Sequence, residues 1–396
     1  MLAPSRTSLP YNTYRQPPRL PLGSDRPGGW RRARRIALTA ALVALVPVLI
    51  SFISYVSQPS NSTLGINVVE WLRDNGARGI VNKVENIYYS MTAPSKGGPA
   101  LHRLPGQAGA LAAGTAAHHN TVHYYLPPPI TPLAHGLPGE GVWQRTFAGS
   151  APEPPVLITS FRPEPVDYPR AIVGVAWINH ADTSVWNYPG RLEPSVSLPS
   201  RGPEEVPLTT RSRLVATFNS GFKLVDSGGG FASGGHTYAP LKNGFATIVR
   251  YTDGHVDVID WTAGSNAPSN VVYARQNLPL IVSGGKPNPN LNNSSEWGAT
   301  LGNQALVWRS AVGVDKYGNL IYAAGPDQGL ASLASTMIHA GADRAMELDI
   351  NTYWTSFISY RYPGAGHPAN LLAIMDRSPL RYLTPDDRDF FAVYVR

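Results

Sequence analysis

The chain has 396 residues, of which 43% are apolar and 15% charged, so it is long and apolar enough to fill one large or two ordinary folded domains. It contains no cysteine, which excludes disulfides, thiolate zinc sites and cysteine nucleophiles. Residues 1–35 hold eight arginines and one aspartate and therefore carry the whole formal net charge of +7. The remaining residues have no basic surplus, so we expect no nucleic-acid partner.

The N-terminal region has the pattern of a membrane anchor. Residues 1–35 are rich in Pro, Arg and Ser, which predicts a disordered tail. An uncharged apolar run from Ile36 to Val56 is long enough to cross a hydrocarbon core of about 30 Å, so residues 36–57 are predicted to be a transmembrane helix. A cleaved signal peptide is the alternative, but its apolar region is usually shorter, about 7–15 residues. The arginines before the run place the N-terminus in the cytoplasm and the folded part outside, which predicts a single-pass protein of the cell membrane.

Two segments separate this anchor from the folded part. Residues 58–91 have apolar residues at helical spacing, interrupted at Asn75-Gly76, which predicts two short helices in a juxtamembrane stalk. The alternative is an amphipathic segment on the outer leaflet, but its mixed charge favours the stalk. Residues 92–135 are rich in Gly, Ala and Pro and read as a linker. This linker contains an HHxxxH pattern, which we interpret as exposed imidazoles rather than a metal site: His118, His119 and His123.

Residues 136–396 have the texture of one folded domain. Short runs rich in Val, Ile, Ala and Thr alternate or cluster as strands do, and Asp253-Gly254 is a hairpin signal between two of them. Few helical windows interrupt the runs, and the clearest spans residues 327–340. The pattern predicts an α+β fold of mixed β-sheets with a few packed helices.

The stretch from Trp308 to Phe357 organises this domain. It predicts a hairpin of Ser310–Asp315 and Leu320–Ala324, then the helix, which ends at a glycine, and then a strand. On that strand the alternation places Glu347 and Asp349 on one face, at the strand's end. Ligand-binding groups collect at such ends in α/β proteins, so the two carboxylates form a candidate site.

Three motifs, in order, resemble those of the phosphodiester glycosidase family. Asn219-Ser220-Gly221-Phe222 resembles its N-G-G-F-F turn, Arg309-Ser310-Ala311-Val312-Gly313 its R-T-A-V-G strand, and Leu348-Asp349 its L-D-G-G strand end. The resemblance covers residues from about Gly139 to about Tyr360 and is closest to a membrane-anchored bacterial branch. It implies an enzyme that cleaves a sugar linked through its anomeric carbon to a phosphate.

The resemblance suggests roles for individual residues. Arg309 offers a bidentate fork for phosphate, and Asp349 is the first choice for the carboxylate that stabilises charge at the anomeric carbon or guides water. Glu347 is a candidate acid, because two neighbouring carboxylates repel and one pKa rises. Asn219 is expected to bind a sugar hydroxyl, and Lys223 lies in the same turn.

The chain departs from the family directly after Asp349. Where much of the family has a glycine-rich loop, this chain has Ile350-Asn351-Thr352-Tyr353-Trp354. A glycine-rich loop would hold a phosphate with its backbone amides, whereas the Asn351 amide and the Trp354 ring are suited to binding a sugar. The substrate is therefore expected to differ more from the family pattern than the reaction does.

Alternatives stay open for these residues. Arg309 could form a buried ion pair with Glu347 or Asp349, and the tryptophans of the domain could be core rather than a sugar platform. No cofactor is predicted, with a divalent ion at Asp349, Glu347 or Asp315 as the alternative. The sequence predicts an extracytoplasmic hydrolase of a glycosyl phosphodiester or related cell-envelope glycan. A non-catalytic glycan-binding protein and an assembly scaffold are the other hypotheses.

Overall fold

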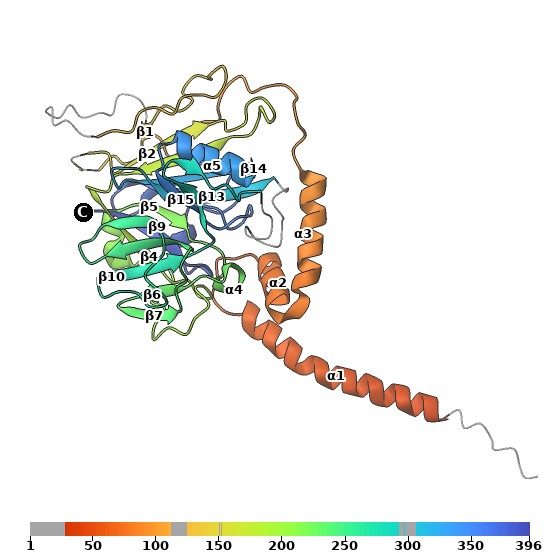
Figure 1. Ribbon diagram of the computed structural model, residues 1–396. Coiled ribbons are helices and arrows are strands. Elements are labelled where there is room, and N and C mark those ends of the chain that lie inside the picture. Colours follow the sequence, from red (N-terminus) through yellow and green to blue (C-terminus); the bar gives the residue numbers. More distant parts are fainter. Residues whose placement is uncertain (1–27, 112–124, 150, 152, 293–296, 298–305) are drawn as a thin grey trace, which may run out of the picture. The chain divides into compact units, whose positions relative to one another are not determined.

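A computed structural model of the chain describes residues 28–111, 125–149, 151, 153–292, 297 and 306–396 (Figure 1). They divide into two compact units between Ser57 and Gln58. The three histidines of the HHxxxH pattern lie outside the described residues.

The described part of the first unit is one helix, α1 (Gly28–Val56). Its segment from Gly29 to Val56 is long and apolar enough to cross a membrane. The helix begins before the predicted apolar run because the arginines between Trp30 and Ile36, which are good helix formers, continue it. The orientation of α1 in a membrane stays a prediction.

The second unit combines β-sheets with a few helices, which confirms the α+β class. The described helices are α2 (Leu64–Leu72), the π-helical turn η1 (Arg73–Ala77), α3 (Arg78–Thr92), the 3-10 turn η2 (Leu208–Arg213), α4 (Leu224–Ser227), α5 (Leu330–His339) and the 3-10 turn η4 (Arg381–Leu383).

The strands form three sheets, and every pairing between described strands is antiparallel. The largest has the order β1 (Gln144–Arg145), β2 (Val156–Phe161), β3 (Val173–Ile178), β14 (Leu320–Gln328), β13 (Val307–Val314), β15 (Arg344–Glu347), β11 (Leu280–Ser283) and β12 (Lys286–Pro287). The second has β7 (His236–Ala239), β6 (Phe231–Ser233), β10 (Val271–Gln276), β8 (Ala246–Tyr251) and β9 (Val256–Asp260). The third has β17 (Gly366–Asn370), β16 (Phe357–Tyr362), β5 (Leu214–Asn219), β18 (Phe390–Val395) and β4 (Thr183–Tyr188).

The large sheet is buried on both faces, as β14 illustrates. Leu320, Tyr322 and Ala324 belong to a core shared with the two smaller sheets. Ile321 and Ala323 belong to a second core, which includes the apolar side of α5. Because side chains alternate along a strand, both sets of residues must be apolar. Figure 1 shows α5 beside β13, β14 and β15.

The predicted hairpin and helix are largely confirmed. β13 pairs with β14 across a turn in which Gly318 has a φ of 87°, and Gly341 ends the helix region with a φ of 96°. The helix was predicted too early, because β14 continues through Gln328 and α5 begins only at Leu330. The last strand was predicted too long: β15 ends at Glu347, so Asp349 lies in the loop beyond it.

The predicted stalk forms two helices, α2 and α3, that break at Asn75 and Gly76, where Gly76 has a φ of 90°. The Thr63 hydroxyl accepts a hydrogen bond from the Ile66 amide and caps α2. The described parts of the predicted linker also contact the domain, since Leu104 packs against the main core and Ile130 is buried. The domain boundary at residue 136 stays a prediction.

Candidate functional site

Asp349 lies where three strand ends meet. It follows β15, and its backbone amide donates to the Ser220 carbonyl in the turn after β5, at 3.0 Å. Its own carbonyl accepts from the Ser310 hydroxyl of β13, at 2.7 Å. Arg388 reaches the same place from the segment before β18. Asp349 is therefore fixed by main-chain contacts to neighbouring elements, and its carboxylate is left to face the site.

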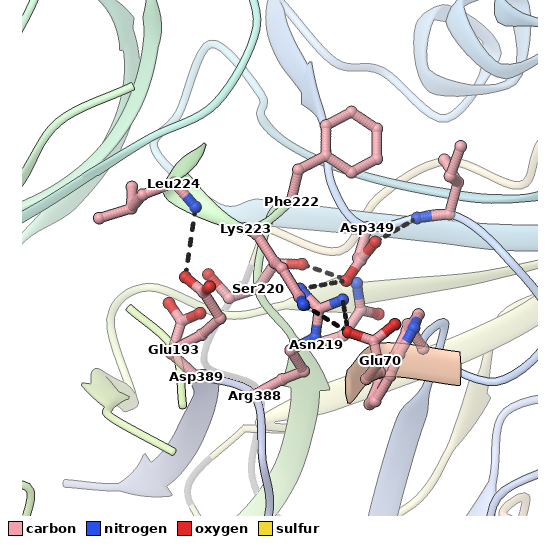
Figure 2. Close-up of polar contacts among 12 residues, drawn as sticks. Glu70, Glu193, Asn219, Ser220, Phe222, Lys223, Leu224, Asp349, Arg388 and Asp389 are labelled. Atoms are coloured by element: carbon pink, nitrogen blue, oxygen red, sulfur yellow. Dashed lines mark hydrogen bonds and ion pairs between the residues drawn. The ribbon is translucent and has the colours of Figure 1, made fainter. Parts of the chain in front are cut away.

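A cavity of about 70 Å³ opens beside this carboxylate. The domain lines it with Phe222, Lys223, Asp226, Asp349, Ile350, Asn351, Trp354 and Arg388, and the α2–α3 hairpin lines it with Arg73, Glu85 and Tyr89. Figure 2 shows the charged side chains that meet next to it: Glu70, Lys223, Asp349 and Arg388. Ligand pockets usually measure about 300–1,000 Å³, so this cavity holds water-sized groups but not a sugar phosphate.

Burial dominates the chemistry of Asp349. The residue is only 6% exposed, and burial raises the pKa of its carboxyl from 3.8 to about 7. Arg388 opposes the rise, with its Nη1 lying 3.6 Å from Oδ2 of Asp349. The negative charge of Glu70 adds to it. A carboxyl whose pKa lies near neutrality suits proton transfer at physiological pH.

Three cations surround Glu70 of α2. Nη1 of Arg73, in the same hairpin, lies 2.9 Å from Oε1 of Glu70. Nζ of Lys223 lies 2.5 Å from Oε2 of Glu70, and Nη2 of Arg388 lies 3.8 Å from the same oxygen. Burial would raise the pKa of Glu70, but Arg388, Lys223 and Arg73 outweigh it and lower that pKa. Glu70 is therefore an internal anion that pairs with Arg73 of its own hairpin and with two buried cations of the domain.

Arg388 has hydrogen-bonding capacity to spare. Its residue is 6% exposed, and its Nη1 is buried without a hydrogen-bond partner among the described residues. Burial opposes its charge, yet the carboxylates of Asp349, Glu70 and Glu193 outweigh this and raise the pKa of Arg388. The Ser220 hydroxyl, in the turn that holds Asp349, is likewise buried and unpaired among those residues. Nη1 of Arg388, which is ion-paired with Asp349 but not hydrogen-bonded to it, can therefore donate to an acceptor that enters the cavity.

The predicted pair Glu347 and Asp349 is not brought together as one carboxylate pair. Oε1 of Glu347 lies 2.5 Å from Nη1 of Arg309, and both residues are almost fully buried. Burial raises the pKa of Glu347, and the neighbouring guanidinium of Arg309 opposes the rise. In this structure Arg309 and Glu347 therefore form a buried ion pair, which is the alternative that the sequence left open. Neither residue lines the cavity.

The other predicted site residues have different positions. Asn219 is fully engaged: Nδ2 donates to the Ser310 hydroxyl and the Ser220 carbonyl, and Oδ1 accepts from the Tyr322 hydroxyl and the Ser356 amide. It therefore positions the loop and has no group left for a sugar.

Lys223, Asn351 and Trp354 all line the cavity. Asn351 has a φ of 87°, a left-handed conformation that glycine and asparagine adopt most readily. The ring of Trp354 is buried and lies 4.4 Å from the guanidinium of Arg388. In this closed arrangement the ring contacts a cation rather than solvent.

Sequence reasoning missed Arg388 and Glu70. Arg388 lies in Asp386-Asp387-Arg388-Asp389, a run of charges directly before the apolar strand β18, and such a run next to a buried strand is a usable signal. Glu70 had no such signal, because one acidic residue in an amphipathic helix is ordinary.

No group of three or more His, Asp or Glu side chains among the described residues is arranged to hold a metal ion. Asp315, named as one alternative ligand, instead accepts hydrogen bonds from the amides of Tyr317 and Asn319 in the β13–β14 turn.

No protein-family model matches the chain, and no curated protein matches it. Among solved structures it is similar to the catalytic domain of zebrafish N-acetylglucosamine-1-phosphodiester alpha-N-acetylglucosaminidase, auto-inhibited by its pro-peptide, at 17% identity and a TM-score of 0.42, covering 62% of this chain and 86% of that one. A hypothetical protein from Synechocystis has 15% identity and a TM-score of 0.35, with 57% and 59% covered. An exported protein from Burkholderia pseudomallei K96243 has 9% identity and a TM-score of 0.24, with 57% and 74% covered. These similarities are too distant to indicate an activity.

Proposed function

We propose that the second unit is an extracytoplasmic hydrolase of a glycosyl phosphodiester or related cell-envelope glycan, with Asp349 as its catalytic carboxylate. The observation that carries the proposal is the buried carboxyl of Asp349, whose pKa is raised to about 7 beside a cavity that is also lined by the cations Arg73, Lys223 and Arg388. A carboxylate next to cations is the pairing that cleavage of a sugar–phosphate bond requires.

Lys223 and Arg388 take the role of phosphate ligands in this proposal. Both are buried cations on the wall of the cavity, and Nη1 of Arg388 has no hydrogen-bond partner among the described residues. Their internal partner, Glu70, has the charge of a substrate anion. Arg309, proposed for the phosphate from sequence, already has Glu347 as its partner.

The cations and the Asp349 carboxylate have separate roles in the proposed reaction. The cations neutralise the phosphate as its bond to the anomeric carbon breaks and it leaves with the bonding electrons. The Asp349 carboxylate stabilises the positive charge at the anomeric carbon or takes a proton from the attacking water. Trp354 and Asn351 lie on the wall where the sugar would bind.

The substrate needs more room than the cavity of about 70 Å³ provides. The α2–α3 hairpin forms one wall, so its displacement is the step that admits a sugar phosphate. Glu70 would then leave Lys223 and Arg388, and the substrate phosphate would take its place.

The test uses the full-length chain in lipid nanodiscs with a panel of sugar 1-phosphodiesters, and it measures the sugar released. Asp349→Asn should lower the rate by about 10²–10⁴-fold, the usual contribution of a positioned acid or base. Asp253→Asn is the matched control, because that exposed aspartate lies in the β8–β9 turn, accepts hydrogen bonds from His255 and does not line the cavity. An Asp349→Asn protein as active as the wild type would refute the assignment.

The Glu70→Gln variant distinguishes a catalytic site that the hairpin keeps closed from a site that has no catalytic activity. If neither the wild type nor Glu70→Gln releases sugar from any substrate while both bind glycan, the non-catalytic alternative is correct. If Glu70→Gln alone is active, the hairpin controls access to a working site.

A further inference from the structure

α3 carries five large apolar side chains that are 59–80% exposed: Ile80, Val84, Ile87, Tyr88 and Met91. Their spacing of three and four residues places them along one side of the helix, and we call them the α3 stripe. Exposed apolar surface that is contiguous marks an interaction site, whereas scattered single residues do not. The α3 stripe is contiguous.

Most charged side chains of the α2–α3 hairpin form ion pairs away from the α3 stripe. Arg78 pairs with Asp226 of α4, and Arg73 pairs with Glu85 at 2.7 Å between Nη2 and Oε1. These charged side chains, which favoured a stalk when only the sequence was considered, therefore form ion pairs within the hairpin and with the domain. Lys83 is exposed next to the stripe.

We propose that the α3 stripe docks on the surface of a lipid bilayer, the one that α1 spans. α1 ends at Val56 and the second unit begins at Gln58, so a membrane-spanning α1 would hold this unit at a bilayer surface. An apolar helix side with a flanking lysine suits that surface, since the side chains enter the boundary between headgroups and acyl chains and the cation meets lipid phosphates. The proposal does not depend on the catalytic role of Asp349.

The absence of cysteine makes the test direct. Ile87→Cys in the full-length chain, labelled with an environment-sensitive fluorophore, is placed in nanodiscs with and without lipids that carry a quenching spin label about 5–10 Å below the headgroups, the depth expected for such a helix. We expect a blue-shifted emission that loses most of its intensity with the spin-labelled lipid. Leu208→Cys is the matched control, because Leu208 is 75% exposed on η2, and it should show neither effect.

Val84→Cys repeats the measurement on the same side of the helix, in case labelling at residue 87 disturbs folding, and unchanged thermal unfolding verifies each labelled protein. Equal quenching at residues 87 and 208 would overturn the proposal, because contact would not be specific to the α3 stripe. A blue shift without lipid quenching would also overturn it, since a second copy of the chain or another protein would then cover the stripe. An emission typical of a water-exposed fluorophore at both residue 84 and residue 87 would overturn the proposal as well.

Discussion

Nζ of Lys223 and Oε2 of Glu70 lie 2.5 Å apart, although one residue belongs to the turn after β5 and the other to α2, far away in the chain. Both side chains are almost fully buried. The pair therefore joins the α2–α3 hairpin to the wall of the candidate site, and it does so through an anion placed where the proposed substrate anion would bind. Because Glu70 is part of the protein, its replacement allows anion binding at this site to be measured without a known substrate.

Glu70→Gln should expose two buried cations to external anions. The variant loses one of the carboxylates around these cations, whereas Asp74 stays 3.0 Å from Lys223 and Asp349 stays 3.6 Å from Arg388. We therefore expect a lower thermal unfolding temperature than that of the wild type, with a loss of stability smaller than the roughly 3–5 kcal/mol that a fully unpaired buried charge costs. Inorganic phosphate should restore part of that loss, since a ligand that binds only the folded state stabilises it. The measurement is the unfolding temperature against phosphate concentration, with chloride at matched ionic strength as the reference.

Glu85→Gln is the control for this experiment. Glu85 lies in the same hairpin and lines the same cavity, but in the described structure it pairs with Arg73 rather than with Lys223 or Arg388. Phosphate should stabilise this variant no more than the wild type. Equal phosphate effects on Glu70→Gln and Glu85→Gln would argue against an anion site at Lys223 and Arg388.

The pH dependence of catalysis follows from the environment of Asp349. The proposed role requires the ionised carboxylate, and burial raises the pKa of that group to about 7, so kcat/KM should rise with pH and level off above about pH 7. The charge of Glu70 contributes to the raised pKa, so Glu70→Gln should move the rise to lower pH. The check is a pH profile of kcat/KM for both proteins. A shift to higher pH, or a rate that falls as Asp349 ionises, would contradict this role.

Local patterns predicted the scaffold well. The predicted hairpin turn between Asp315 and Leu320 contains Gly318, and the glycine predicted to end the helix is Gly341; both have positive φ values. The helix start was wrong because Pro326 and Asp327 resemble a helix opening, yet β14 continues through them and its last residue, Gln328, pairs with Val307 of β13. That pairing is tertiary, and no local pattern reports it.

The candidate site could not be predicted from local patterns, because it depends on contacts between residues that are distant in the sequence. β13 and β15 are neighbours in the sheet although β14 and α5 separate them in the chain, and the register places Ala311 opposite Glu347. Arg309, two residues from Ala311 and on the same face, is then a diagonal neighbour of Glu347. The sequence contained both residues of that pair but not their register. Glu70 lies still further away in the chain, on an element whose folding back onto the domain has no local signature.

The stability of the fold should also report the ionisation of Asp349. Its folded-state pKa of about 7 is above the ordinary value of 3.8, because burial disfavours the charged form. The folded state therefore holds the proton more tightly, and this contribution is complete below about pH 4 and is lost as the pH rises through 7. Asp349→Asn removes the ionisation, so the variant should gain stability relative to the wild type from pH 4 to 7, by at most about 1.4 kcal/mol per pH unit. Denaturant unfolding at several pH values measures the difference, and a constant or opposite difference would contradict the raised pKa.

The Arg309–Glu347 pair gives a test that separates structure from substrate binding. Arg309→Leu leaves Glu347 buried without its cation and also removes the hydrogen bond from Nε of Arg309 to the Gln328 carbonyl, so it should destabilise the fold by about 3–5 kcal/mol. The double variant Arg309→Leu with Glu347→Leu leaves no charge stranded, so it should be more stable than Arg309→Leu alone. Because neither residue lines the cavity, the folded double variant in a Glu70→Gln background should keep its stabilisation by phosphate. Loss of the phosphate effect in a protein that remains folded would support the phosphate-binding role that the family resemblance suggested for Arg309.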